Sequence, residues 1–392
     1  MKVLVVHNTY QQRGGEDTVF ESEVELLKKN NIIVDTLLYD NHEIKTTKDK
    51  ILTGLLAVYN PRGKKKLLEK IRAFKPDIIH IHNFFPLASP SIFYATQELR
   101  IPVVMTLHNY RLICPSAYLY FNGRIYEDNI YKRFPLKPIL QGVYRESMVQ
   151  TASLVFMTGV HKILKTWSKK IDRYITLTEF AKKKFIGTSL GASEQQFVVK
   201  PNFVPDIGVG KDKRKDFLFI GRLSEEKGIA TMLNAFSESK SNIKILGDGP
   251  LKSMVETAAN EHENIEYLGF RPRKEVVEIL KSVKALIFTS VWYEGMPMVI
   301  LEAFSVGTPI ISSNIGGPAE MIQDNYNGLL FEPADSTELK NKISLLEEDN
   351  TLLGRLSNNA RETYTQKFTS EVNIKLLLEI YQQTIKQKKK NP

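Results

Sequence analysis

The sequence predicts an α/β protein with two doubly wound domains in tandem, each built on a parallel sheet. Short apolar runs alternate with longer amphipathic patterns along most of the 392 residues, which is typical of alternating strands and helices. Runs such as LFI, VVM and ALIF are apolar throughout, as strands that are covered on both faces require. The alternation restarts once near the middle of the chain, so we expect two such domains.

The expected strands form two sets of six. The first set covers residues 2–7, 32–39, 77–82, 102–107, 173–177 and 197–200. The second set covers residues 216–220, 243–246, 265–268, 285–288, 309–312 and 328–331. Amphipathic helices are expected between most of these strands, for example over 17–30, 251–261 and 276–281.

The boundary between the domains is expected within residues 201–216, where prolines, glycines and a charge run are typical of a linker. We place the first domain at residues 1–205 and the second at 206–368. A C-terminal helix is expected over about 369–388, and it could pack back on the first domain. Residues 110–167 fit the alternation poorly, so we interpret them as an insertion of loops and helices.

The composition excludes several classes of protein. Hydrophobic residues make up 42% and charged residues 25% of the chain, so most of it should fold into globular domains. The single cysteine, Cys114, excludes an internal disulfide and a cysteine-based zinc site. We interpret the short first apolar run as a strand rather than a signal peptide, and no apolar run is long enough to span a bilayer. We therefore expect a cytoplasmic protein.

The net charge of +10 is unevenly distributed along the chain. Residues 1–206 carry 30 Lys and Arg against 19 Asp and Glu, a net charge of +11, whereas the remainder is at −1. A basic surface of this kind can simply be solvated, or it can face an anionic membrane or an anionic acceptor. We expect no nucleic-acid partner, because the sequence has no zinc-finger spacing and no RNP-like motif.

A loop with two cations follows the first strand of the second domain. It contains Gly221, Arg222, Lys227 and Gly228, and a helix is expected to follow. The glycines permit a tight backbone, and the start of a helix favours anions. An arginine can grip two oxygens of a diphosphate, while a lysine acts as a point charge. The alternative is a solvated loop that carries surface cations.

Two carboxylates mark the loop and helix after the ALIF strand. Glu294 precedes Gly295, and Pro297 stands where a helix should begin, to end before Gly307. Glu302 then lies within an otherwise apolar helix, where a carboxylate needs a partner. Vicinal sugar or ribose hydroxyls are suitable partners, and free amides at the helix start could bind sugar oxygens. The alternative is a capping Glu294 and a Glu302 that is paired with a cation.

A glycine pair, Gly14 and Gly15, follows the first strand of the first domain and precedes a helix. Glycines let the backbone approach a ligand closely, and the helix start faces the same place. The pair does not belong to a GxGxxG dinucleotide fingerprint. A tight turn without a ligand is an equally good explanation.

Three histidines lie at the ends of strands in the first domain, namely His80, His82 and His108. Residues at the carboxyl ends of parallel strands line the ligand crevice in such folds. A histidine at a strand end is more often structural than catalytic, but three at one rim favour a functional site. We expect no metal, because no carboxylate with suitable spacing accompanies them and the chain has no Asp-x-Asp pair for a metal-bound diphosphate.

The second half of the chain resembles retaining glycosyltransferases of family 4, whose GT-B fold has two Rossmann-like domains that face a central cleft. The matching motifs are GRLSEEKG at 221–228, GDGP at 247–250, LGF at 268–270, Glu-x7-Glu at 294–302, GTPIISSNIGGPAEMI and NGLLFEP. The first half, through HNTYQQRGGED, HIHNFFPLASPSIFYA and TLHNYRLICP, resembles a bacterial subgroup associated with surface polysaccharides.

The resemblance implies a role for each residue at a matching position. Arg222 and Lys227 would bind the donor diphosphate and stabilise it as a leaving group. Glu302 would bind the ribose hydroxyls, and Glu294 and His108 would contact the donor sugar. The further donor-binding positions are Gly14, Gly15, Gly221, Phe270, Gly295, Met296, Pro297 and Met298.

Two departures from the family pattern change what the resemblance implies. Asn109 stands where many members have Asp, so a carboxylate role is lost at this position. The subgroup often has further cysteines near Cys114, whereas residues 126–129 contain none. We therefore expect no bound zinc.

The resemblance thus implies a retaining, metal-independent hexosyltransferase that needs no cofactor. It would move a sugar from a UDP- or GDP-sugar, held mainly by the second domain, to a saccharide or lipid-linked acceptor held mainly by the first. The implied pathway is the synthesis of a bacterial capsule, exopolysaccharide or O-antigen. Alternatives are a nucleotide-sugar epimerase or a phosphorylase on the same architecture, or a non-catalytic protein that binds a polysaccharide or a sugar nucleotide.

Two segments of the basic half combine apolar and basic residues, at 51–66 and at 154–170, with Trp167 near the basic end of the second. Interfacial helices bury such an apolar face and set Lys and Arg among anionic headgroups. We therefore expect peripheral binding to the inner face of the cell membrane. The alternative is that both helices pack on the sheet and leave their lysines in water.

Overall fold

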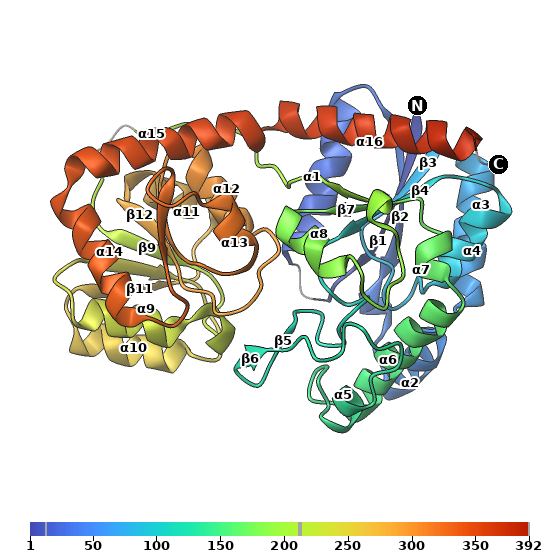
Figure 1. The fold of residues 1–392 in the computed structure, drawn as a ribbon, viewed down its shortest axis with the longest axis horizontal. Coiled ribbons are helices and arrows are strands. Elements are labelled where there is room, and N and C mark those ends of the chain that lie inside the picture. Colours follow the sequence, from blue (N-terminus) through green and yellow to red (C-terminus); the bar gives the residue numbers. More distant parts are fainter. Residues whose placement is uncertain (12–13, 211–213, 391–392) are drawn as a thin grey trace. The chain divides into compact units, whose positions relative to one another are not determined.

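The computed structural model describes residues 1–11, 14–210 and 214–390, which fold into two compact units (Figure 1). The first unit comprises Met1–Phe121, Tyr126–Lys200 and Ile374–Pro392, and the second comprises Asn122–Ile125 and Pro201–Asn373. Of the expected linker, residues 201–210 have no regular secondary structure, and 211–213 lie outside the described residues.

The first unit is built on a six-stranded parallel sheet in the order β2-β1-β3-β4-β7-β8. Its strands are β1 (Lys2–Thr9), β2 (Ile33–Asp40), β3 (Ile78–Ile81), β4 (Val103–Leu107), β7 (Arg173–Thr176) and β8 (Phe197–Val199). Strands β3 and β4 are buried along their whole length, as their apolar sequences predict. All six strands that the sequence predicts in this half form, with ends that differ by one or two residues.

Nine α-helices of different lengths accompany this sheet in the described part of the chain. They are α1 (Gly15–Lys29), α2 (Thr47–Leu56), α3 (Pro61–Phe74), α4 (Ser91–Glu98), α5 (Lys137–Leu140), α6 (Met148–Ile163), α7 (Thr166–Lys169), α8 (Glu179–Phe185) and most of α16 (Ser370–Lys390). Helix α1 begins two residues before the predicted start, because Asp17 accepts a hydrogen bond from the Gly14 amide at 2.9 Å. No helix in the described part of the chain combines the length and apolar character that a membrane span needs.

The insertion predicted over residues 110–167 contains the short hairpin strands β5 (Tyr120–Phe121) and β6 (Arg124–Ile125) and most of α5 to α7. The apolar and basic segment 154–170 is not one helix, since α6 ends at Ile163 and α7 begins at Thr166. The prediction that Trp167 lies at the basic end of an interfacial helix is wrong. Its side chain is fully buried, and its indole nitrogen donates a hydrogen bond to the carbonyl of Thr158.

The second unit has its own six-stranded parallel sheet, in the order β11-β10-β9-β12-β13-β14. Its strands are β9 (Phe217–Ile220), β10 (Ile243–Leu246), β11 (Ile265–Gly269), β12 (Ala285–Phe288), β13 (Ile310–Ser313) and β14 (Gly328–Phe331). Each lies within one residue of its predicted position. Their side chains form one core with the surrounding helices, as Phe217, Ile245 and Ile287 illustrate.

The helical elements of the second unit carry several of the predicted site residues. They are η3 (Glu225–Lys227), α9 (Ile229–Ser237), α10 (Lys252–Glu261), α11 (Arg273–Ser282), α12 (Met298–Ser305), α13 (Gly316–Met321), α14 (Ser336–Glu348) and α15 (Asn350–Lys367). Helix α12 begins one residue after Pro297, which occupies the capping position before the first turn.

The strand order of each sheet changes direction beside its first strand. In the second unit the chain runs from β9 outward through β10 and β11, and then returns with β12 on the other side of β9. Loops that leave such a switch point diverge, so a crevice opens at the carboxyl ends of the two strands. Arg222 and Lys227 follow β9, and Glu294 follows β12. The predicted residues of this unit therefore gather at its switch point.

Candidate functional site

The loops after β9 and β12 meet through an ion pair. The ammonium group of Lys227 contacts Oε1 of Glu294. The same oxygen accepts hydrogen bonds from the indole of Trp292 at 2.7 Å and from the hydroxyl of Ser290 at 3.1 Å. The Lys227 ammonium also lies 5.4 Å from the Trp292 ring centroid, within reach of a cation–π contact. The carboxylate of Glu294 and the ammonium group of Lys227 are thus fixed side by side, and both side chains are largely buried.

Gly228 locks these two loops together. It has a φ of +66° and joins η3 to α9. A Cβ atom at this position would lie 2.0 Å from the carbonyl oxygen of Thr289, so only glycine fits without moving the backbone. The Thr289 hydroxyl donates to the Lys227 carbonyl at 2.7 Å. The position of Lys227 therefore follows from backbone geometry rather than from the ion pair alone.

Arg222 supplies a second cation in the loop that follows β9. It lies directly after Gly221, whose amide donates to the carbonyl of Leu246, and its side chain is exposed. Among the residues that the structure describes, no carboxylate pairs with this guanidinium. An exposed arginine, a fixed lysine and the start of α9 together provide the charge that an anion such as a diphosphate needs.

The loop from Gly295 to Met298 is held against a glycine pair. The amide of Gly317 donates to the carbonyl of Glu294 at 2.9 Å, and a Cβ at Gly317 would lie 1.9 Å from the Gly295 carbonyl. Met296 is buried and its sulfur accepts from the Asn202 amide. Phe270, by contrast, is 82% exposed just after β11. Whether these positions bind a donor stays a prediction.

Glu302 has the partner that its apolar helix demands. Its Oε1 lies 3.2 Å from Nη2 of Arg273 on α11. Burial raises the pKa of the Glu302 carboxyl group, although the nearby Arg273 opposes this shift. The structure therefore contains the cation pair that the sequence left as an alternative. A role of Glu302 toward ribose hydroxyls stays a prediction.

In the first unit, Gly14 and Gly15 border open space. Gly14 caps α1, and a Cβ at either glycine would meet no described atom within 4 Å. The neighbouring Asp17 is buried and accepts from the Gly14 amide and from Nε2 of His7, at 2.9 and 2.8 Å. Sequence reasoning missed Asp17. Free space beside a helix start suits a ligand that approaches the backbone.

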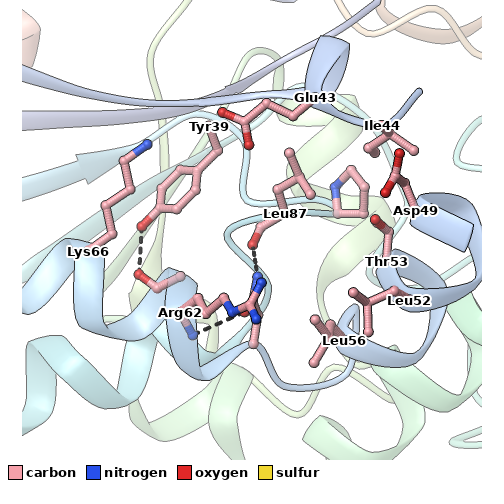
Figure 2. Close-up of a pocket in the computed structure, with 13 residues that line it drawn as sticks. Tyr39, Glu43, Ile44, Asp49, Leu52, Thr53, Leu56, Arg62, Lys66 and Leu87 are labelled. Atoms are coloured by element: carbon pink, nitrogen blue, oxygen red, sulfur yellow. Dashed lines mark hydrogen bonds between the residues drawn. The ribbon is translucent and has the colours of Figure 1, made fainter. Parts of the chain in front are cut away.

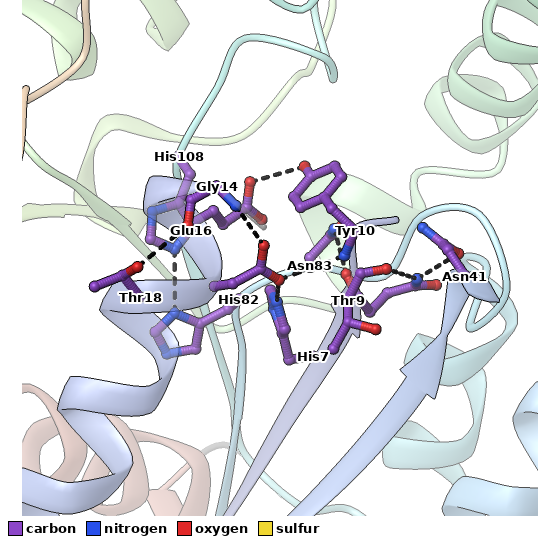
Figure 3. Close-up of polar contacts among 12 residues, drawn as sticks. His7, Thr9, Tyr10, Gly14, Glu16, Thr18, Asn41, His82, Asn83 and His108 are labelled. Atoms are coloured by element: carbon purple, nitrogen blue, oxygen red, sulfur yellow. Dashed lines mark hydrogen bonds and ion pairs between the residues drawn. The ribbon is translucent and has the colours of Figure 1, made fainter. Parts of the chain in front are cut away.

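His82 and His108 contact each other at the carboxyl ends of β3 and β4. Nδ1 of His82 lies 3.1 Å from Nε2 of His108 (Figure 3). The expectation that no carboxylate accompanies the histidines is wrong, because Glu23 of α1 lies 3.2 Å from His82 and 2.9 Å from His80. Glu23 is 57 or more residues away from them in sequence, but it occupies the buried face of an amphipathic helix. A carboxylate on that face was the signal that could have revealed it.

The same three residues are the one set of described side chains with the spacing of a metal site. They fit a metal poorly, because the second oxygen of Glu23 is already bound to the buried ammonium group of Lys200 at 2.8 Å. A divalent cation here would add two more positive charges to a site that Lys200 already neutralises. We therefore assign Glu23, His80 and His82 to a hydrogen-bonded cluster.

A further polar cluster, which sequence reasoning missed, lies beside His108. The hydroxyl of Tyr10 donates to Oε2 of Glu16 at 2.8 Å (Figure 3). Burial raises the pKa of Glu16 to about 7, although the charge of Arg111 opposes this shift. Glu16, Arg111 and His108 line one small cavity of about 20 Å³. A carboxyl group that titrates near neutral pH therefore lies next to a predicted site residue.

A larger cavity of about 260 Å³ lies at the carboxyl end of β2 (Figure 2). Its wall includes Tyr39, Glu43 and Arg62, and also Leu52 and Leu56 of α2. The cavity therefore combines acidic and basic side chains with an apolar wall. Small-molecule binding sites commonly combine an apolar lining with a few polar groups in this way.

Family models match both halves of the chain. Residues 11–206 match the model described as Glycosyltransferase Family 4, and residues 205–363 match the model described as Glycosyl transferases group 1. An uncharacterized glycosyltransferase of Methanocaldococcus jannaschii, MJ1178, is 25% identical over 98% of this chain and 98% of its own length. The lipopolysaccharide 1,6-galactosyltransferase of Escherichia coli is 29% identical over 42% of this chain and 49% of its own length.

The solved structures that resemble the chain include Anabaena Alr3699/HepE in complex with UDP. It covers 97% of this chain and 99% of its own, with a TM-score of 0.67 at 17% identity. The chain therefore has the GT-B fold of glycosyltransferases, with two six-stranded parallel sheets, as the sequence predicts. The chain belongs to glycosyltransferase family 4, and it is an enzyme that uses a nucleotide sugar.

Proposed function

We propose that this enzyme transfers a sugar from a UDP- or GDP-sugar, with retention of configuration and without a metal ion, to a hydroxyl of a saccharide or lipid-linked acceptor. The convergence of Arg222, Lys227 and Glu294 at the switch point of the second unit carries this proposal. The two cations suit a diphosphate, and the carboxylate beside them suits the hydroxyls of the attached sugar. The UDP complex of HepE gives general support for the choice of donor.

The proposed reaction needs charge stabilisation rather than a protein nucleophile. The bond between the anomeric carbon and the diphosphate oxygen breaks, and the diphosphate gathers negative charge. Arg222, Lys227 and the start of α9 stabilise this charge in place of a metal. The acceptor hydroxyl forms the new bond on the face that the diphosphate leaves, and its proton passes to the departing phosphate oxygen.

The remaining assignments follow the family resemblance. We propose that Glu302 binds the ribose and exchanges part of its contact with Arg273 for two hydroxyls. The backbone at Gly15 approaches the phosphates, and His108 contacts the donor sugar. The other proposed donor contacts are Gly14, Gly221, Phe270, Gly295, Met296, Pro297 and Met298.

We propose that the acceptor belongs to a bacterial surface polysaccharide and binds the first unit. The cavity lined by Tyr39, Glu43 and Arg62 supports this choice, because it combines hydrogen-bonding groups with an apolar wall (Figure 2). The similarity to a lipopolysaccharide galactosyltransferase supports the same pathway class. Leu52 and Leu56 of helix α2 form part of the cavity wall.

We also propose that the first unit binds an anionic membrane surface. Helices α2, α5 and α6 lie together in this unit (Figure 1), and the hydroxyl of Ser153 donates to the carbonyl of Gly54 at 2.8 Å between α2 and α6. Large apolar side chains of these helices are exposed. We call them the apolar patch, which consists of Ile51, Leu52, Leu55, Leu140, Met148, Val149, Phe156 and Ile163.

The apolar patch has cations close by in sequence. Lys48 and Lys50 on α2, Lys137 on α5 and Arg145 just before α6 are all exposed. Lys64 is less suited to contact lipid headgroups than the sequence suggests, because it pairs with Glu98. Apolar side chains surrounded by cations are typical of helices that lie in an anionic interface.

The experiment that tests the proposed function is a screen of the purified enzyme against UDP- and GDP-sugars. Thermal shift identifies the donor that binds, and release of the nucleoside diphosphate is then followed with and without a saccharide or lipid-linked acceptor. We expect acceptor-dependent release and a product with the anomeric configuration of the donor. Epimerisation of the donor without an acceptor, or binding without turnover, would contradict the proposal and favour an epimerase or a binding protein.

A further inference from the structure

A chain of buried polar groups runs through the first unit to His108. Glu23 lies on the inner face of α1 and Lys200 follows β8, and both side chains are about 1% exposed. Their charged groups are 2.8 Å apart. Glu23 also contacts His80 and His82, and His82 contacts His108. The family motifs of the chain do not account for this arrangement.

The charge state of Glu23 follows from its surroundings. Burial alone raises the pKa of a carboxyl group, but Lys200 and the two histidines outweigh that effect and hold the pKa of Glu23 well below its usual range. Glu23 is therefore a carboxylate and acts as a hydrogen-bond acceptor only. Lys200 neutralises it, so the pair can be buried.

This carboxylate fixes the proton of His82. Burial lowers the pKa of His82 to about 3, so the ring is neutral and carries one proton. Nε2 lies 3.2 Å from Oε1 of Glu23, and a carboxylate oxygen can only accept. The proton must therefore be on Nε2, which leaves Nδ1 of His82 as an acceptor.

The proton of His108 is fixed in the same way by its contact with His82. Burial lowers the pKa of His108 well below its usual value, so this ring is also neutral. Its Nε2 lies 3.1 Å from Nδ1 of His82, which can only accept. Nε2 of His108 must therefore donate, and Nδ1 is left with a free lone pair. His108 itself is partly exposed and lines a cavity with Glu16 and Arg111.

We propose that Glu23 and Lys200 are positioning residues for His108: acting through His82, they present its unprotonated Nδ1 as a hydrogen-bond acceptor for a hydroxyl group of the donor sugar. This inference rests on the proposed function in one respect, namely that His108 contacts the donor. It implies that the site selects a hydroxyl, because an anionic or carbonyl oxygen could not donate to Nδ1.

Two neighbouring groups allow the chain to be tested selectively. Tyr381 of α16 lies 2.7 Å from Nδ1 of His80, and Thr106 lies 2.8 Å from its Nε2. His80 shares Glu23 with His82 but makes no hydrogen bond or ring contact with His108 among the described residues. The substitution Tyr381→Phe therefore perturbs the cluster without breaking the path from Glu23 to His108, and it is the matched control.

The experiment uses the full chain labelled with ¹⁵N at its seven histidines, whose ring signals report which nitrogen bears the proton. His108 is assigned by the signal lost in His108→Gln. The test variant is Glu23→Leu with Lys200→Met, because an apolar pair of similar volume often replaces a buried ion pair without loss of folding. Glu23→Gln with Lys200→Met retains an acceptor oxygen and serves as the conservative rescue.

In the wild type we expect His108 protonated only at Nε2. The Leu/Met variant should show both tautomers and lose about tenfold or more in kcat, the scale at which a partner of a functional histidine acts. The Gln/Met and Tyr381→Phe variants should stay close to wild type. A wild-type His108 protonated at Nδ1, unchanged signals in the Leu/Met variant, or a tightly bound metal ion in the purified protein would overturn the inference.

The two proposals can fail separately. If no nucleotide sugar is turned over by the wild type, the proposed function fails, but the histidine signals still decide whether Glu23 and Lys200 set the tautomer. If transfer occurs with the donor and the tautomer of His108 does not depend on Glu23, the inference fails alone.

Discussion

The ammonium group of Lys227 lies against the carboxylate of Glu294, although 67 residues separate them in the chain. Each residue follows a different strand, and the two strands, β9 and β12, are neighbours at the switch point of the sheet. The fold thus brings together two residues whose motifs the sequence could only treat separately. Their proximity places the cation that we propose for the diphosphate and the carboxylate that we propose for the sugar in a single site.

The first prediction concerns the turnover of variants at this site. Replacement of Arg222 or Glu294 by Ala should lower kcat by about a hundredfold or more, the usual effect of losing one preorganised electrostatic contact. Folding of the Arg222 variant should survive, since Arg222 is exposed. Lys342→Ala, which removes a partly exposed helix cation beside Glu338, is the control and should leave activity unchanged. Near wild-type turnover in either site variant would refute the assignment.

The second prediction concerns the glycine that joins the two loops. Gly228→Ala should destabilise the protein by about 2 kcal/mol or more, because its φ is +66° and the new Cβ would clash with the Thr289 carbonyl. Gly354→Ala in α15 meets no described atom within 4 Å and should instead stabilise by roughly 0.5–1 kcal/mol. Urea denaturation measures both. Equal effects of the two substitutions would contradict the backbone argument.

The third prediction concerns pH. Burial raises the pKa of Glu16 to about 7 from its ordinary value of 4.5, so the folded state prefers the protonated form. The stability that depends on this proton is complete below pH 4.5 and is lost as the pH rises through 7. Glu16→Gln should therefore become more stable relative to wild type between pH 5 and 8, by about 1.4 kcal/mol for each pKa unit of the shift.

Denaturation curves of both proteins across this pH range provide the measurement for Glu16. The control is Glu69→Gln, since Glu69 is exposed on α3. Its stability should follow the wild type at every pH. If Glu16→Gln also follows the wild type, burial does not shift the pKa of Glu16.

The fourth prediction concerns the membrane. Co-sedimentation with liposomes should need anionic lipid and weaken at high salt. Val149→Glu with Leu55→Glu should abolish it, because these apolar side chains are 80% and 73% exposed. Lys48→Glu with Lys50→Glu should weaken it. Leu345→Glu, an exposed position on α14 of the second unit, should have no effect. Equal recovery of the protein with neutral and anionic vesicles, or no recovery with either, would contradict the proposed binding to an anionic membrane.

The sheets could be predicted closely because strands buried on both faces have unmistakable apolar runs. The strand order could not, since pairing between distant strands leaves no local pattern. Glu302 was identified as a carboxylate in an apolar helix, and the same test would have found Glu23 in α1. This test could not have identified Lys200 as the partner of Glu23, because Lys200 lies at the end of a strand 177 residues away in sequence.

Helix composition alone does not predict the environment of Trp167. Trp167 and the basic residues after it resemble a membrane boundary in sequence, yet the turn between α6 and α7 directs the indole into the core. Exposure depends on where a helix ends, and helix ends are the least determined feature of a sequence. The apolar patch on α2, α5 and α6 could be identified only from the exposed side chains of these helices.

The most direct test of the account is the binding of UDP and GDP, measured by isothermal titration calorimetry in the presence of EDTA. We predict that the wild type binds one of these diphosphates at a single site without a metal. It should bind the corresponding monophosphate more weakly, and the Arg222→Ala and Lys227→Ala double variant should lose at least about tenfold in affinity. Binding that requires Mg²⁺ or Mn²⁺, or equal affinity in the double variant, would contradict the claim that these two cations replace a metal at the diphosphate.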